Sequence, residues 1–141
     1  MIRKLQQSDI DQVINIWLEA SIKSHDFVKT EFWKSKVKDM RELYIPSGET
    51  YVYEEEGIKG FVCLRNDMLA AIFVSPEFQG MGIGRQLMKK AKNIRKNLNL
   101  TVYKENTKSI EFYKKCGFEI EQERIDKHTG HPELIMRFKS Y

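Results

Sequence analysis

Three glycines stand at alternate positions between an apolar run and a stretch with helical periodicity. They are Gly80, Gly82 and Gly84, within the segment Gln79-Gly80-Met81-Gly82-Ile83-Gly84-Arg85. Glycine lets the main chain pass close to a ligand, and the free N–H groups at a helix N-terminus attract anions. The segment therefore predicts a loop that binds a phosphate or pyrophosphate, to which Arg85 adds a charged donor.

The glycine spacing excludes two common nucleotide-binding loops. A Walker loop ends in Gly-Lys-Ser or Gly-Lys-Thr, and that ending is absent. A dinucleotide fingerprint has its third glycine one residue later and follows a βαβ unit that opens the chain, which this sequence lacks. A turn without a ligand is the remaining alternative. Glycine lowers the stability of a helix, so three glycines at alternate positions across a helix start need another reason. Binding of a ligand is such a reason, and we prefer it to a turn without a ligand.

A tyrosine on a later predicted helix offers a different chemistry. Phe112 falls on an apolar position of that helix, and Tyr113 lies one position round from it. An aromatic residue on this helix can serve simply to pack in the core, and Phe112 fits that interpretation. Tyr113 fits a functional role better, because a tyrosine hydroxyl can donate a proton to a leaving group.

Hydrophobic periodicity predicts the elements that must position these residues. Helices are expected over Ile10–Leu18 after the N-cap Ser8, and over Thr30–Leu43, Ile83–Lys96 and Asn106–Cys116. Pro46-Ser47-Gly48 is expected to break the second helix, and Gly117 to end the fourth. Strands are expected at Met1–Leu5, Thr50–Glu54, Ile58–Leu64, Met68–Val74, Leu98–Tyr103, Phe118–Ile125 and Glu133–Phe138.

The order of these elements predicts an α/β fold with a mixed, mostly antiparallel sheet of about seven strands and helices on both faces. Met68–Val74 and Leu98–Tyr103 flank a helix, so they form a parallel pair with a right-handed crossover. Met68–Val74 is apolar on both faces and is expected at the centre of the sheet. Ligands settle beyond the carboxyl ends of such strands, which indicates Ser75–Gly84 and Lys104–Asn106.

Size and composition fit one globular domain spanning residues 1–141. The chain is 41% hydrophobic and 31% charged. Its longest apolar run, Met68–Val74, is far below the ~20 residues that cross a bilayer, and no apolar signal segment follows Met1. We therefore expect a cytoplasmic protein with no membrane partner.

Net charge and residue spacing indicate which classes of partner and cofactor to expect. The net charge of +4 suits a phosphate-bearing partner. The aromatic residues lie at apolar periodic positions instead of on a basic face, so nucleic acid is not an expected partner. The two cysteines and three histidines lack the spacing of metal ligands, so no metal cofactor is expected.

Two motifs together resemble the signatures of the GNAT superfamily of N-acetyltransferases. Gln79-x-x-Gly82-x-Gly84 is similar to that family's acetyl-CoA-binding motif, Arg/Gln-x-x-Gly-x-Gly/Ala. Asn106-x-x-Ser109-x-x-Phe112-Tyr113-x-x-x-Gly117-Phe118 resembles its second signature, with Ser109 where alanine is commoner. The element order also matches over nearly the whole chain. The segment Ile16–Phe27 is similar to small bacterial members reported as protein-lysine acetyltransferases.

The resemblance implies transfer of an acetyl group from acetyl-CoA to a primary amine, by direct attack in a ternary complex. The acceptor, a protein lysine, an N-terminus or a small amine, stays open, as does the choice between monomer and homodimer. A non-catalytic module that binds or senses acyl-CoA is the alternative function. The presence of Tyr113 argues against that alternative.

The resemblance also implies a role for individual residues. Tyr113 would protonate the departing thiolate, Asn106 would bind the pantetheine arm beside Ser109, and a main-chain N–H near Val74 would stabilise the oxyanion. The main chain of Phe73 and Val74 would pair with the pantetheine as an added strand. The pyrophosphate would lie on the loop of Gln79, Gly80, Met81, Gly82, Ile83, Gly84 and Arg85.

The general base is the least determined part of the mechanism. A lysine amine has a pKa of ~10.4, so it must be deprotonated before it attacks. The candidates are His25, Glu54 and Glu77, acting directly or through water. His25 stands beside Asp26 in the connector between the first two helices, which borders the acceptor in this family. It is named with Tyr113 as a catalytic candidate, and simple packing of the connector is its alternative role.

Overall fold

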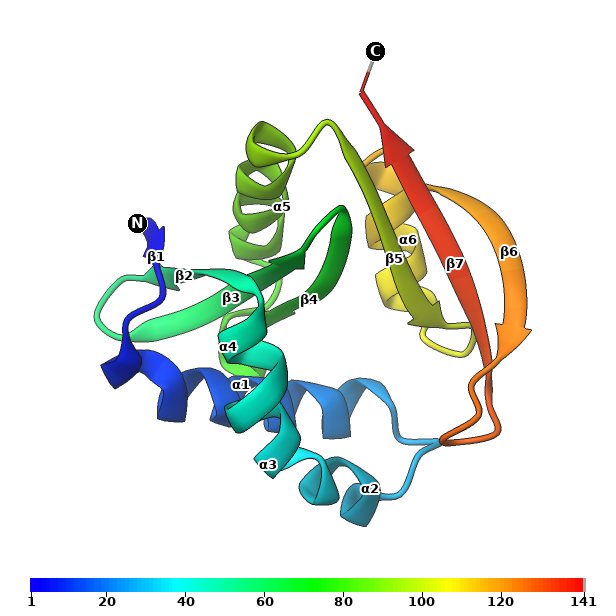
Figure 1. Ribbon diagram of the computed structural model, residues 1–141, viewed down its shortest axis with the longest axis horizontal. Coiled ribbons are helices and arrows are strands. Elements are labelled where there is room, and N and C mark those ends of the chain that lie inside the picture. Colours follow the sequence, from blue (N-terminus) through cyan, green and yellow to red (C-terminus); the bar gives the residue numbers. More distant parts are fainter. Residues whose placement is uncertain (141) are drawn as a thin grey trace.

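The computed structural model describes residues 1–140 and shows one sheet with helices on both faces (Figure 1). The strands follow the order β1-β2-β3-β4-β5-β7-β6. Their bounds are β1 Ile2–Lys4, β2 Glu49–Glu54, β3 Ile58–Arg65, β4 Met68–Val74, β5 Asn97–Tyr103, β6 Glu119–Ile125 and β7 Pro132–Lys139. The α-helices are α1 Ile10–Ser24, α2 Thr30–Ser35, α3 Val37–Asp39, α4 Ile45–Ser47, α5 Ile83–Ile94 and α6 Thr107–Lys115.

The strand pairing confirms the predicted fold class. Neighbouring strands run antiparallel throughout the sheet, except that β4 and β5 run parallel. The chain crosses from β4 to β5 through α5, as a βαβ unit requires. The strand expected at the centre, β4, is the fourth of seven.

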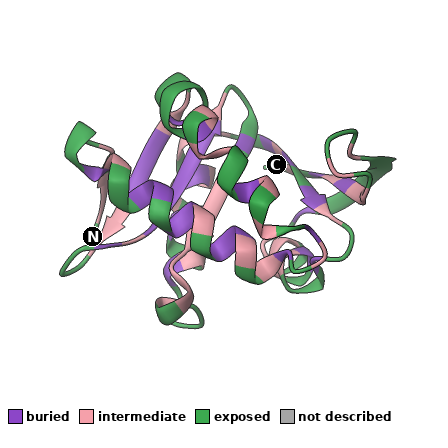
Figure 2. Cartoon of the chain, turned by 90° about the horizontal axis from the view of Figure 1, so that it is seen from below, coloured by how far each residue is buried: buried purple, intermediate pink, exposed green. Residues whose placement is uncertain are grey.

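Two apolar cores lie on opposite faces of the sheet. Alternate residues of one strand serve both, because successive side chains of a strand point to opposite faces. Val62 packs in the core under α5 and α6, whereas its neighbour Phe61 packs in the core beside α1 and α2. At Gly60 a β-carbon would lie 2.9 Å from the Phe73 carbonyl and 3.2 Å from the Ile83 side chain, so glycine lets α5 approach the sheet closely. Figure 2 shows buried residues recurring along the strands and along the inner faces of the helices.

The sheet splits between β4 and β5. Cys63 of β3 pairs with Ala71 and its successor pairs with Leu69, so Ala70 is an extra residue, a β-bulge, on β4. A bulge bends its strand. The two strands share the pair Met68↔Asn99 before the bulge and diverge after it (Figure 1). The later half of β4 is only half-buried despite its apolar sequence, because it borders an opening.

Several predicted helix boundaries are wrong. The segment expected as one helix over residues 30–43 is instead α2, α3, a π-helical stretch Met40–Tyr44 and α4. Pro46 does not end the helical path, because it lies within α4, which continues directly from the π-helical stretch, and the chain leaves the helix at Gly48. Helix α5 ends at Ile94, two residues earlier than expected, because Arg95 is extended.

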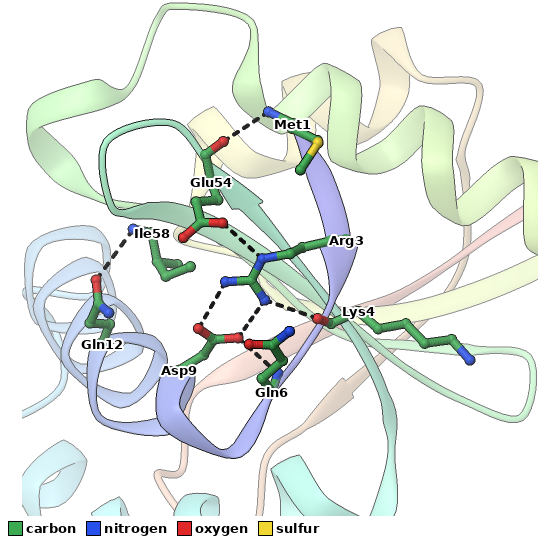
Figure 3. Close-up of polar contacts among 8 residues, drawn as sticks. All are labelled: Met1, Arg3, Lys4, Gln6, Asp9, Gln12, Glu54 and Ile58. Atoms are coloured by element: carbon green, nitrogen blue, oxygen red, sulfur yellow. Dashed lines mark hydrogen bonds and ion pairs between the residues drawn. The ribbon is translucent and has the colours of Figure 1, made fainter.

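The start of α1 also differs from the prediction. Ser8 is not an N-cap, because it lies in a 3-10 turn, Gln7–Asp9, that precedes the helix. The buried Asp9 carboxylate accepts from Arg3 at 2.7 Å, and Arg3 also contacts Glu54 at 2.8 Å (Figure 3). The Arg3 guanidinium lowers the pKa of the Asp9 carboxyl. This cluster ties β1 and β2 to α1.

Within residues 1–140, no helix is long and apolar enough to cross a membrane.

Candidate active site

A cleft of about 990 Å³ opens where β4 and β5 separate. One wall is formed by β4, the glycine loop and the start of α5, and the other by β5, the start of α6 and the end of α1. Met81 lies outside it, with a side chain that is 68% exposed. The other residues predicted to bind the cofactor, together with His25 and Tyr113, line this cleft: His25, Phe73, Val74, Gln79, Gly80, Gly82, Ile83, Gly84, Arg85, Asn106, Ser109 and Tyr113.

The glycine loop presents main-chain donors to the cleft. Gly80 and Gly82 have φ angles of +83° and +85°, a region that side chains disfavour. A β-carbon at either position would meet nothing within 4 Å, so the space beside both glycines is open. The first helical hydrogen bond runs from Gln86 to Gly82, which leaves the N–H groups of residues 83–85 without a partner in the helix. Such groups can bind an anion.

The edge of β4 offers further main-chain groups. The N–H of Ser75 donates to Lys59 of β3 at 2.8 Å. Hydrogen-bonded and non-hydrogen-bonded positions alternate along an antiparallel pair, so the N–H and C=O of Val74 point away from β3, toward the cleft. The Val74 carbonyl accepts from the Gln79 side chain at 3.1 Å. By the same alternation the main chain of Phe73 faces β3, so its predicted main-chain contact with a ligand does not fit this register.

Tyr113 reaches the cleft from α6. Its ring packs against Phe112 and Phe118, with centroids 5.6 and 5.8 Å away. Enclosure by the protein raises the pKa of the Tyr113 hydroxyl well above its ordinary range, and Cys116 acts in the same direction. The hydroxyl therefore stays protonated at neutral pH and is able to donate a proton. The ring satisfies the packing role and the hydroxyl remains available for chemistry.

His25 caps the end of α1 and is 7% exposed. Its Nδ1 lies 3.0 Å from the Ser21 carbonyl, and its Nε2 lies 3.1 Å from Nδ2 of Asn106. Burial lowers the pKa of the imidazole, so the ring is neutral near physiological pH. Both ring nitrogens are engaged, which does not fit the predicted role of a free base.

An aromatic cluster closes one end of the cleft. The His25 ring lies 5.7 Å from Phe27, 5.0 Å from Trp33 and 5.3 Å from Tyr103. The Tyr103 hydroxyl donates to Asp126 in the turn between β6 and β7. Burial is the main cause that raises the pKa of Tyr103, and this bond adds to it. The connector after α1 is thereby joined to the far half of the split sheet.

The carboxylates on the cleft are not those predicted. Glu54 pairs with Arg3, Glu77 is exposed on a 3-10 helix, and neither lines the cleft. Three other carboxylates line it instead: Asp26, Glu105 and Glu133. Glu133 and Tyr103 were not predicted as site residues, because pairing between β5 and β7 brings them to the site, and Glu105 was given no individual role although it lies within the indicated segment Lys104–Asn106. The available signal was that Glu105 directly precedes Asn106.

The two glutamates differ in their surroundings. Glu133 stands opposite Tyr103 in the register of β5 and β7. Its side chain is 12% exposed and accepts from Arg124 at 2.9 Å. Glu105 is more exposed and lies 3.1 Å from His131. Of the two, Glu133 is the more enclosed carboxylate at the end of the cleft where the aromatic cluster lies.

Comparison with known proteins places these features in a family. The model of the acetyltransferase (GNAT) domain matches residues 46–120. Over 138 residues, covering 96% of this chain and 94% of that protein, the chain is 34% identical to the peptidyl-lysine N-acetyltransferase YiaC of Escherichia coli strain K12. The solution structure of apo YjaB from Escherichia coli matches with a TM-score of 0.85 and 25% identity, over 100% of this chain and 98% of that one. The PaiA N-acetyltransferase of Thermoplasma acidophilum, solved with coenzyme A, has the same fold, with a TM-score of 0.83 and 21% identity over 100% and 98% of the two chains.

Proposed function

This chain belongs to the GNAT family of acetyltransferases, and we propose that it transfers the acetyl group of acetyl-CoA to the side-chain amine of protein lysines. The observation that carries the proposal is the split between β4 and β5. It leaves the main chain of Val74 without a partner strand on the cleft side, beside the free N–H groups at the start of α5, in one cleft with Tyr113. An extended arm with a phosphate at one end and a reactive carbonyl at the other fits such a cleft.

The residues present fit acetyl-CoA along the length of this cleft. The N–H groups of residues 83–85 and the Arg85 side chain would hold the pyrophosphate, and the open space beside Gly80 and Gly82 leaves room for it. The pantetheine arm would pair with the free edge of Val74 and contact Asn106. When bound, acetyl-CoA supplies a thioester carbonyl for an amine to attack.

The chemistry of the chain favours direct attack by the amine. Cys63 and Cys116 do not line the cleft, and burial raises the pKa of both thiols, so neither is an activated nucleophile. The Val74 N–H would stabilise the negative charge that develops on the acetyl oxygen. Tyr113 would then pass its proton to the departing thiolate. Intact mass measurement after incubation with acetyl-CoA alone should detect no covalent acetyl-enzyme, and a stoichiometric adduct would contradict direct attack.

The acceptor end of the cleft suits a cationic side chain. Asp26, Glu105 and Glu133 line the cleft, and carboxylates attract the ammonium form of lysine as it approaches. The relatives YiaC and YjaB are both named peptidyl-lysine N-acetyltransferases. Because a lysine amine titrates near ~10, it must lose a proton before it attacks, and we propose that Glu133 accepts this proton, directly or through water.

An acceptor panel tests the proposed function. The panel holds a peptide with one internal lysine and a blocked N-terminus, the same peptide with arginine for lysine and a free N-terminus, and a polyamine. With acetyl-CoA, we expect acetylation at the lysine Nε, located by mass spectrometry, with release of free thiol. Acetylation of the α-amine or the polyamine alone would contradict the lysine acceptor. Binding of acetyl-CoA with no turnover on any acceptor would favour the non-catalytic module instead.

A further inference from the structure

A buried hydrogen bond joins two segments of the same wall of the cleft, between residues 81 positions apart in the chain. His25 Nε2, at the end of α1, lies 3.1 Å from Asn106 Nδ2, which precedes α6. The other ring nitrogen, Nδ1, lies 3.0 Å from the Ser21 carbonyl. A carbonyl can only accept, so Nδ1 carries the proton of the neutral ring, and Nε2 accepts from the Asn106 amide.

The Asn106 amide is held at both of its ends. Its Oδ1 accepts from the Ser109 N–H at 3.3 Å and thereby caps α6, while one hydrogen of Nδ2 goes to His25. If the amide turned by 180°, its Oδ1 would face His25 Nε2, and both are acceptors. Its Nδ2 would then face the Ser109 N–H, and both are donors. The second Nδ2 hydrogen therefore has a fixed direction, set by His25.

The surroundings keep His25 in this orientation. Rings of Phe27, Trp33 and Tyr103 lie 5.0 to 5.7 Å from the imidazole, so the ring has no room to turn its Nε2 toward a substrate. The nearby titratable groups are the Tyr103 hydroxyl, which donates to Asp126, and His131, which lies beyond Phe27.

We infer that His25 is a positioning residue that orients the Asn106 amide for the pantetheine arm of acetyl-CoA, and that it does not remove the proton of the acceptor amine. The inference rests on the proposed function through the contact between Asn106 and the cofactor. It predicts that His25 acts on cofactor binding, whereas a base would act on the rate of the chemical step.

Protonation of His25 would break this arrangement. A protonated ring donates from both nitrogens, so Nε2–H would face the Nδ2–H of Asn106. The amide would have to turn, and the cap at Ser109 would be lost. Cofactor affinity should therefore weaken in acid as His25 takes up a proton, even when no acceptor is present.

Binding of coenzyme A, measured by titration calorimetry, tests the inference without turnover. His25→Leu removes the acceptor of the Asn106 bond and should weaken the Kd about tenfold, as expected for a misplaced hydrogen-bond partner. His25→Gln keeps an acceptor oxygen near the position of Nε2 and should restore most of that loss. His131→Leu is the matched control, because it alters the same aromatic cluster without reaching Asn106, and its Kd should stay near that of the wild type.

A double-mutant cycle separates action through Asn106 from general damage. Asn106→Ala should weaken binding of coenzyme A, and adding His25→Leu should weaken it no further, because the amide that His25 orients is gone. Additive losses would overturn the inference. An unchanged Kd in His25→Leu would overturn it too, while leaving the proposed function in place. A wild type that does not bind coenzyme A would overturn both.

Two further measurements hold even where His25→Leu fails to fold. In the wild type, nitrogen NMR of the imidazole should find the proton on Nδ1, and a proton on Nε2 would overturn the inference. In His25→Gln, acetylation should persist and binding of coenzyme A should weaken less in acid than in the wild type. A fall in kcat of about 10²-fold or more in this variant, with an unchanged Kd, would instead identify His25 as the base.

Discussion

The two walls of the cleft are built in opposite ways. The wall proposed to hold the cofactor phosphates is one continuous segment, from Val74 to Arg85, and it offers main-chain groups. The opposite wall gathers side chains from the end of α1, from β5 and β7 and from the start of α6, and it offers polar and aromatic groups. The first wall depends on backbone shape, whereas the second depends on contacts between distant segments.

This difference separates the kinds of damage that substitutions can do. In the glycine loop a new side chain is harmful through its bulk, charge or backbone strain, because glycine conformation and open space are what the loop supplies. On the opposite wall the loss of a single atom is harmful, because each group has a particular partner.

Gly82→Glu should abolish the rise in melting temperature that acetyl-CoA produces in the wild type. A carboxylate would enter the open space beside the loop and repel the pyrophosphate. Gly82→Asn is the control, because asparagine tolerates a positive φ and carries no charge, and it should keep part of the rise. An undiminished rise in the glutamate variant would remove the loop from the cofactor site.

Tyr113→Phe should lower kcat by roughly 10²–10⁴-fold, the usual contribution of general acid catalysis, with little change in cofactor affinity. The ring keeps its contacts with Phe112 and Phe118, so only the proton donor is lost. Tyr103→Phe is the matched control, since Tyr103 also lines the cleft but its hydroxyl donates to Asp126. If both variants retain wild-type kcat where chemistry limits the rate, Tyr113 is not the acid.

Glu133→Gln should lower kcat/KM on a lysine peptide by about 10²-fold, the lower end of what a general base contributes. The loss should be smaller on an α-amine, whose pKa of ~8 demands less help. Glu54→Gln is the control, because Glu54 pairs with Arg3 and lies off the cleft. Equal losses on both acceptors would argue that Glu133 only steers the substrate.

Acid should destabilise the folded protein partly through His25. Burial lowers the pKa of His25 in the folded state, so below about pH 6.5 the unfolded chain takes up a proton that the folded chain refuses. This part of the stability is present above pH 6.5 and is lost as the pH falls toward the folded pKa. Thermal melts from pH 7.5 to 5 should lose less stability in His25→Gln than in the wild type. His128→Gln, at an exposed site, should keep the wild-type slope, and identical slopes in all three proteins would refute the prediction.

Met81→Ser should change cofactor affinity by no more than about twofold, the scale of a neutral surface substitution. Its side chain is exposed and off the cleft, although it stands in the middle of the glycine loop. A calorimetric titration with coenzyme A measures this directly. A large loss would mean that the loop binds through side chains as well as through its main chain, and would weaken the contrast between the two walls.

The strand, loop and helix that form the wall from Val74 to Arg85 were predictable from the sequence because their features are local. A strand, the glycines at 80, 82 and 84, and the amphipathic helix after them are all legible within one short window. The prediction of one helix over residues 30–43 was wrong because the path of this segment depends on distant contacts. Its apolar positions are compatible with a regular helix, and packing against the sheet selected the broken path with a π-helical stretch.

The sequence by itself determined the fold class, the glycine loop at the start of a helix and the placement of Tyr113 on a later helix, since each depends on spacing along the chain. Only the tertiary structure decided which carboxylates line the cleft, that Val74 and not Phe73 turns its main chain toward it, and that His25 bonds to Asn106. The bulge at Ala70 opens the sheet, and contacts between residues as far as 81 positions apart complete the second wall. Contacts of that range leave no period or motif in the sequence, because they depend on how the elements pack and not on their order.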